Sequence, residues 1–154
     1  MHGFPSCSHT FRHVLAPLAE VSRVIAPDLP GFGFSAVPGV DSYDYTFAGL
    51  ADTVEAFLDR IGVRKFFVYL HDFGAPVGYH LATRHPERIL GLIVQNGNAH
   101  EEGLGAPWNS ARAFWADPSP GGRGPGGRGR ADHLFRLRQQ AHVAQGRRGH
   151  LHRR

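Results

Sequence analysis

The sequence predicts an α/β protein: about three parallel strands with flanking helices, followed by a disordered basic C-terminal tail. The first observation is that short apolar runs alternate along the chain with segments of helical periodicity. Uninterrupted apolar runs are typical of parallel strands that helices cover on both faces. The second observation is a change of composition near Pro118, after which glycine and arginine dominate. In parallel sheets of this kind, functional side chains gather at the carboxyl ends of the strands.

Each expected element rests on a local pattern. In chain order we expect a helix over 10–20, a strand over 23–26, a helix over 47–61, a strand over 65–70, a helix over 75–84 and a strand over 89–94. Thr46 is an N-cap residue for the second helix, Gly62 closes that helix, and Pro86 limits the third. Strands therefore alternate with helices, which is the order that parallel units require.

The basic net charge of +4 belongs to the C-terminal tail. Residues 1–118 hold eight Lys or Arg and twelve Asp or Glu, whereas residues 119–154 hold nine Arg and one Asp. The tail has too few apolar side chains to offset the entropy of ordering it. Two interpretations stay open: an arginine–glycine segment that binds RNA by charge, or a non-native end such as a shifted reading frame. We favour the second, and expect any nucleic-acid binding from the tail only.

Composition also bears on the cellular setting and on cofactors. No run of eighteen apolar residues is present, so we expect no membrane span. The first residues lack the pattern of a signal peptide, and the lone Cys7 cannot form an intramolecular disulfide, which fits a reducing, cytoplasmic setting. His100 and the two glutamates after it are adjacent rather than at metal-ligand spacing, so we expect no metal and no other cofactor.

A glycine pattern at 31–36 raises a dinucleotide-binding alternative. The residues match the spacing G-x-G-x-x-A after an expected strand. That fingerprint must open a helix directly, so that a phosphate meets the helix N-terminus. Here a Pro-Gly pair follows, and no helix is expected before Thr46. We therefore reject nucleotide binding.

The segment 68–78, Val-Tyr-Leu-His-Asp-Phe-Gly-Ala-Pro-Val-Gly, has the strand, tight turn and helix of a nucleophile elbow. Asp72 stands where the usual motif has serine, and Gly74 and Gly78 let the turn pack closely. A second interpretation stays open, in which Asp72 caps the following helix, a role worth about 1 kcal/mol. Two further motifs stand where strands are expected to end: His-Gly-Phe-Pro at 2–5 and Asp-Leu-Pro-Gly-Phe-Gly-Phe-Ser at 28–35.

These motifs, together with Leu-Asp-Arg-Ile-Gly-Val at 58–63 and His-Pro-Glu-Arg-Ile at 85–89, make residues 2–118 resemble the α/β-hydrolase fold superfamily. The aspartate at the elbow resembles the branch of haloalkane dehalogenases and soluble epoxide hydrolases. The resemblance implies that Asp72 attacks a small apolar epoxide or halide and forms an alkyl-ester intermediate. It also implies that the backbone N–H groups of Phe4 and Phe73 form the oxyanion hole, and that Trp108 binds substrate from the start of a helical lid.

Two departures from the family pattern, and the question of a base histidine, limit what the resemblance implies. Phe73 stands where many relatives have a tryptophan whose indole N–H holds the leaving halide, which weakens a dehalogenase interpretation. Asn96 stands where some dehalogenases place the catalytic acid, and an amide cannot act as a carboxylate. His100 is the one histidine expected on the active-site side, and adjacency alone does not make it a base. We therefore expect a chain without base and acid, limited to the first half-reaction or inactive.

The resemblance divides the chain into a partial α/β-hydrolase core over 1–100, the start of a lid over 101–118 and the tail over 119–154. It implies further strands before and after this core, so we expect a chain truncated at both ends, with unpaired sheet edges that favour aggregation. Two hypotheses follow. One is a hydrolase acting on a small apolar substrate, and the other is a non-enzymatic fragment whose Arg/Gly tail binds RNA or another polyanion. The sequence leaves the oligomeric state open.

Overall fold

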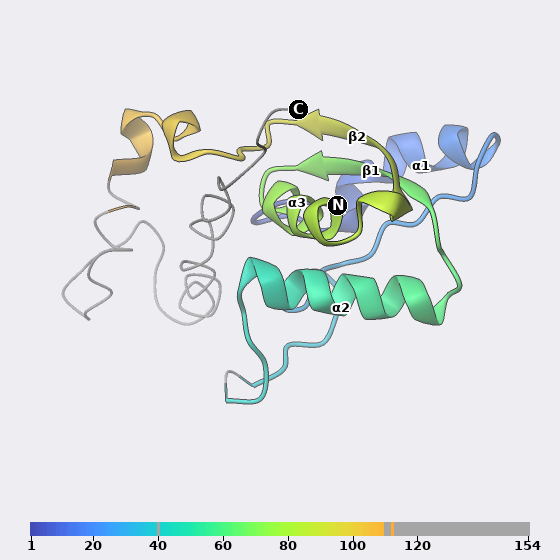
Figure 1. The fold of residues 1–154 in the computed structure, drawn as a ribbon, viewed down its shortest axis with the longest axis horizontal. Coiled ribbons are helices and arrows are strands. Elements are labelled where there is room, and N and C mark those ends of the chain that lie inside the picture. Colours follow the sequence, from blue (N-terminus) through green and yellow to red (C-terminus); the bar gives the residue numbers. More distant parts are fainter. Residues whose placement is uncertain (40, 110–111, 113–154) are drawn as a thin grey trace, which may run out of the picture.

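The computed structural model describes residues 1–39, 41–109 and 112 (Figure 1). The described part contains three α-helices and two strands: α1 (Arg12–Ala19), α2 (Phe47–Arg60), β1 (Phe66–His71), α3 (Gly74–Arg84) and β2 (Ile89–Gln95). Four short 3-10 helices accompany them: η1 (Ser8–Phe11), η2 (Pro86–Arg88), η3 (Glu101–Gly103) and η4 (Ala106–Trp108). The expected tail over 119–154 lies outside the described residues, as does most of 110–118.

The two strands form a parallel sheet, with α3 as the crossover between them. The register pairs Phe66 with Ile89 and His71 with Gln95, with one irregularity after Phe66. Figure 1 shows both arrowheads at the same edge, and α3 between the strands and α2. The α/β class and the parallel pairing are therefore confirmed, as are the positions of the second and third predicted helices to within one residue.

The expected strand over 23–26 is wrong. The sheet has two strands, and among the described residues no strand pairing or backbone hydrogen bond involves 23–26. On the side of β1 away from β2 lies Met1, whose carbonyl accepts a hydrogen bond from His71 N at 3.2 Å and whose amino group donates to Tyr69 O. A strand requires a neighbouring backbone for its ladder. The apolar run 23–26 has no such neighbour among the described residues.

The main core lies between α2, α3 and the turn near residue 30. Its buried members are Leu29, Phe32, Leu50, Ala51, Val54, Leu58, Val77 and Leu81. The α2 residues among them recur at helical spacing, which is why this helix has one buried face. A smaller cluster joins Val68, Leu70 and Ala75 under the sheet. Helix α1 differs, because none of its residues is buried.

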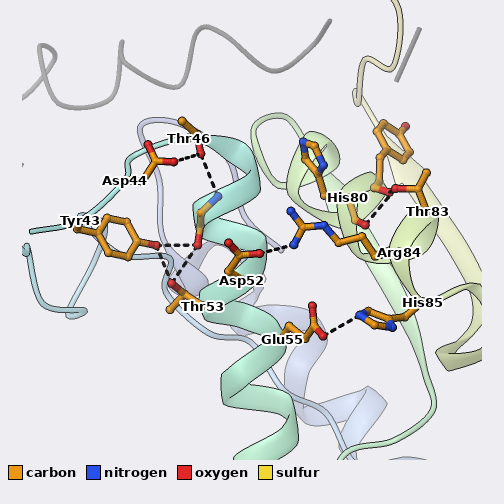
Figure 2. Close-up of polar contacts among 12 residues, drawn as sticks. Tyr43, Asp44, Thr46, Asp52, Thr53, Glu55, His80, Thr83, Arg84 and His85 are labelled. Carbon is orange, nitrogen blue, oxygen red and sulfur yellow. Dashed lines mark hydrogen bonds and ion pairs between the residues drawn. The ribbon is translucent and has the colours of Figure 1, made fainter. Parts of the chain in front are cut away.

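Polar contacts at the rim of this core join α2 to α3 (Figure 2). Arg84 donates to the Asp52 carboxylate, and His85 Nε2 lies 2.7 Å from Glu55 Oε1. These side chains are partly exposed, and ion pairs of this kind contribute at most about 1 kcal/mol each. Burial therefore holds the two helices together more than charge does.

The start of α2 is capped as the sequence predicted. The Thr46 hydroxyl accepts a hydrogen bond from the Gly49 N–H at 3.0 Å, so Thr46 is the N-cap.

Strand β2 carries exposed apolar side chains on both faces, and among the described residues no strand pairs with its outer edge. Leu90, Leu92, Ile93 and Val94 are all exposed large apolar side chains. An uncharged apolar edge strand without proline offers its backbone to another chain. Among the described residues, no helix has the length and apolar character that crossing a bilayer requires.

We expect Leu50→Ala to lower the free energy of unfolding by about 2–5 kcal/mol, because it leaves a cavity in the main core. Leu50 is 1% exposed. The matched control is Leu18→Ala on α1, where leucine is 49% exposed and the change should cost less than about 1 kcal/mol. Urea denaturation followed by circular dichroism measures both. Equal losses for the two variants would contradict the assignment of the core.

We expect the protein to self-associate through β2, and Ile93→Lys to shift it toward the monomer. Ile93 is 53% exposed, and a lysine on an edge strand opposes pairing with a second chain. The matched control is Val21→Lys, which adds the same charge at a residue that is 82% exposed and lies outside the sheet. Light scattering across a concentration series compares the three. A monomeric wild-type protein with a sharp cooperative thermal transition would refute this expectation.

Candidate active site

The turn between β1 and α3 presents Asp72 at the carboxyl end of the strand. Asp72 has φ 49°, in the left-handed region that non-glycine residues rarely adopt. The next residue, Phe73, is the N-cap of α3 and makes no side-chain capping bond. Asp72 contributes its backbone carbonyl to Ala75 N at 2.9 Å, whereas its carboxylate does not cap the helix. The helix-capping interpretation is therefore wrong, and a strained turn carries an available carboxylate.

Close packing around this turn explains the glycines of the two motifs. A Cβ on Gly3 would lie 2.3 Å from Asp72 Cβ, and one on Gly74 would lie 2.6 Å from the Met1 carbonyl oxygen. A Cβ on Gly78 would lie 2.0 Å from a methyl carbon of the fully buried Leu70. No side chain fits at these distances. The backbones of the elbow and of the His-Gly-Phe-Pro segment are therefore in direct contact.

The contact between these segments is a hydrogen bond to the candidate nucleophile. Phe4 N donates to Asp72 Oδ1 at 2.7 Å, across 68 residues of sequence. The distance is that of a strong bond to a charged acceptor. Among the described residues, the structure records no hydrogen bond to the other carboxylate oxygen and none from Phe73 N–H to this carboxylate. Of the two expected oxyanion donors, Phe4 alone therefore contacts Asp72.

The residues on either side of the Phe4–Asp72 bond carry aromatic rings that pack together. The Phe73 ring lies 5.7 Å from the Phe4 ring and 5.5 Å from the Phe47 ring, between centroids. Aromatic pairs at these distances stabilise each other beyond simple burial. Because Phe73 offers no ring N–H, this cluster lacks the indole donor that the resemblance implied at this position.

The motif at 28–35 supports the N-terminal segment that contains His-Gly-Phe-Pro at 2–5, which we call the first motif. Asp28 Oδ1 accepts Ser8 N at 2.6 Å, and Oδ2 accepts Phe34 N at 2.9 Å. Burial raises the pKa of Asp28, but the hydrogen bonds from Phe34 and Ser8 and the nearby His2 outweigh it, so the pKa lies below its ordinary value. Sequence reasoning missed this role. The signal was present as an aspartate before a glycine-rich turn, a residue type that binds backbone N–H groups.

The glycines of this motif form a turn. Gly31 and Gly33 have φ 84° and 51°, and Gly31 N donates to Ala36 O at 3.0 Å. Among the described residues, no helix follows until α2 begins at Phe47. The structural context that a dinucleotide fingerprint needs is absent from this described stretch, as the sequence predicted.

The remaining predicted residues lie after β2. Asn96 has φ 48° directly beyond the strand, and His100 is exposed on the following loop. Trp108 is the last residue of η4, on a segment that continues past the arrowheads of both strands (Figure 1). Among the described residues, no histidine hydrogen-bonds to Asp72 and no three His, Cys, Asp or Glu side chains gather as a metal site. The structure brings Phe4, Phe73 and Asp72 together, and records no bond from His100 to them.

We expect Asp28→Asn to destabilise the protein by about 1–3 kcal/mol, because an amide cannot accept both N–H groups. The exposed Asp41→Asn is the control and should change stability by less than about 0.5 kcal/mol. The lowered pKa means that the Asp28 contribution is present above about pH 3.9 and is lost as the pH falls through the folded-state pKa. Thermal unfolding against pH measures it. If Asp28→Asn lost as much stability on acidification as the wild-type protein does, this role would be contradicted.

Comparison with known proteins places this geometry in a family. A family model described as the alpha/beta hydrolase fold matches residues 1–142. An uncharacterized hydrolase of Saccharomyces cerevisiae is 43% identical over 116 residues, covering 75% of this chain and 39% of that protein. A haloalkane dehalogenase of Mesorhizobium japonicum is 39% identical over 92 residues, covering 60% of this chain and 29% of that protein.

Solved structures agree with the sequence matches. An epoxide hydrolase solved without ligand superposes with a TM-score of 0.63 at 26% identity, over 77% of this chain and 43% of that one. The chain thus spans less than half the length of each of these three proteins. The strand-to-helix turn at Asp72 and the family match over residues 1–142 both indicate the α/β-hydrolase fold. The chain belongs to the α/β-hydrolase fold family, in the branch of the haloalkane dehalogenases and epoxide hydrolases.

Proposed function

We propose that this chain carries the nucleophile of a hydrolase, and that Asp72 attacks a small apolar molecule bearing a carbon–halogen bond or an epoxide. One observation carries the proposal. The Asp72 carboxylate stands on a left-handed turn with Oδ1 held by Phe4 N–H at 2.7 Å, while Oδ2 has no hydrogen bond from the described residues. A carboxylate oriented through one oxygen has the other ready to form a bond.

The first half-reaction follows from this geometry. Asp72 Oδ2 attacks the electrophilic carbon, a C–O bond forms, and the bond from carbon to halide or to epoxide oxygen breaks. The halide leaves as an anion, whereas an opened epoxide oxygen takes a proton from water. Asp72 is then an ester whose carbonyl oxygen is Oδ1. Phe4 N–H already contacts that atom.

The second half-reaction would use the same donor. Water that adds to the ester carbonyl places negative charge on Oδ1, and donors aimed at this atom stabilise it. Phe4 supplies one such donor, and Phe73 N–H, at the first residue beyond the nucleophile, is proposed as the second. A base must activate the water. Because no described histidine bonds to Asp72, we propose that this part of the chain forms the ester and hydrolyses it slowly or not at all.

The walls of the site bear on the substrate. The Phe73 ring, on the residue after Asp72, packs against the rings of Phe4 and Phe47, and we propose that this apolar cluster favours an apolar substrate. Phe73 has no ring N–H to stabilise a leaving halide. We therefore propose that epoxides react faster than alkyl halides. Trp108, on the segment beyond the strand ends, is proposed to contact the substrate from the lid side.

The test is intact-mass spectrometry of the protein after incubation with a reactive terminal epoxide or a primary alkyl bromide. We expect one adduct on the wild-type chain, mapped to Asp72 by peptide digestion, and none on Asp72→Asn above background. The matched control Asp44→Asn should retain the adduct. The Asp44 carboxylate accepts a hydrogen bond from the Thr46 hydroxyl at the start of α2, and the structure records no bond between it and the elbow. Absence of an adduct on folded wild-type protein, or equal labelling of Asp72→Asn, would overturn the nucleophile assignment.

A further inference from the structure

The carbonyl oxygen of Gly3 receives an unusual number of donors. Ser6 N donates to it at 2.9 Å, Ser6 Oγ donates to it at 2.9 Å, and His2 Nδ1 lies 3.1 Å from it. This oxygen belongs to the same peptide unit as the Phe4 N–H that contacts Asp72. The unit is planar and trans, so its C=O and N–H point in opposite directions. Fixing the carbonyl on one side therefore aims the N–H on the other side at Asp72 Oδ1.

We propose that His2 and Ser6 are positioning residues, which hold the Gly3–Phe4 peptide so that its N–H meets the Asp72 carboxylate and the oxyanion that forms there. The proposal rests on the proposed function for its catalytic meaning. Its structural content, the coupling of two side chains to the Phe4 N–H, stands separately. Donors on a carbonyl also polarise the peptide, and hydrogen bonds in such a chain strengthen one another.

The tautomer of His2 follows from its second nitrogen. Leu29 N donates to His2 Nε2 at 3.1 Å, so Nε2 accepts and the proton is on Nδ1, where it donates to Gly3 O. The ring is 0% exposed and packs edge-on against Phe32 at 5.1 Å. A proton on Nε2 would face the Leu29 N–H, donor against donor. Only the neutral ring satisfies both neighbours.

The charged groups that face His2 come from three segments. Burial lowers the pKa of His2 below its ordinary value and outweighs the Gly3 hydrogen bond and the Asp28 carboxylate, which raise it. The Met1 amino group also faces it, and burial lowers the pKa of that group to about 6. Asp72 lies on the far side of Gly3. The His2 contribution is therefore present above about pH 6.5 and is lost as the pH falls through the lowered pKa.

Two pairs of variants separate positioning from mere packing. In His2→Asn the amide N–H₂ replaces the Nδ1 donor but does not titrate. His80→Asn is the matched control, because burial also lowers the pKa of His80, which lies on α3. Ser6→Ala removes one donor to Gly3 O and leaves Ser6 N in place. Ser22→Ala is its control, because Ser22 Oγ bonds to Leu18 O at 3.3 Å, at the end of α1.

The experiment follows the Phe4 amide of the full chain by NMR after ¹⁵N-phenylalanine labelling, from pH 8 to pH 5. We expect its proton resonance to move upfield as the pH falls, with a midpoint below 6.5, in the wild-type protein and in His80→Asn. His2→Asn should abolish this transition. Ser6→Ala should move the resonance upfield at every pH, and Ser22→Ala should not. A transition that persists in His2→Asn, as the Met1 amino group would cause, or a Phe4 amide unmoved by Ser6→Ala, would overturn the proposal.

The alkylation of Asp72 supplies the second readout. We expect Ser6→Ala to slow the limiting rate of adduct formation about two- to tenfold, because a less firmly held Phe4 N–H orients the Asp72 carboxylate less well for attack, without changing the half-saturating epoxide concentration. If no variant and no wild-type protein forms an adduct, the proposed function fails while the Phe4 amide still decides the coupling. If His2→Asn does not fold, Ser6→Ala decides alone. Wild-type alkylation rates in a folded Ser6→Ala would refute the catalytic role.

Discussion

The hydrogen bond from Phe4 N–H to Asp72 Oδ1 is the constraint on which the candidate site depends. It joins an N-terminal turn to a strand end 68 residues away, and it fixes which carboxylate oxygen faces the backbone and which faces a substrate. The close packing of the neighbouring backbone allows this donor–acceptor distance of 2.7 Å. Gly3 and Gly74 are glycines because the elbow and the first motif touch there, with no room for a Cβ. The left-handed backbone conformation of Asp72 (φ 49°) accompanies this close approach of the two segments.

Two buried or partly buried polar residues hold the rest of the first motif. Asp28 binds one N–H on each side, from Ser8 and from Phe34, so that the turn at 28–35 and the segment after the first motif share one carboxylate. His2 bridges the same two segments through Leu29 N and Gly3 O. A buried polar group is costly unless it is satisfied, and no described buried side-chain nitrogen or oxygen is without a partner. The site is therefore a network with few independent parts.

Local patterns predicted the fold where the elements bury a periodic face. Helix α2 follows from its apolar spacing and from Thr46, and β1 and β2 follow from uninterrupted apolar runs. The same reasoning was wrong for 23–26, since an apolar run becomes a strand only beside another backbone. It also left Asp72 between nucleophile and helix cap. The positive φ and the bond to Phe4 reject the capping role, and neither quantity is visible in a residue pattern.

The sequence by itself determined the α/β class, the order of the elements, the elbow with aspartate in place of serine, and the membership of the α/β-hydrolase fold family. Tertiary structure alone decided which backbone N–H holds the carboxylate, that Phe73 packs against the Phe4 ring and makes no recorded bond to that carboxylate, and that His2 is neutral with its proton on Nδ1. The physical reason is range. Periodicity and turn chemistry act over a few residues, whereas these contacts join positions 27 to 69 residues apart.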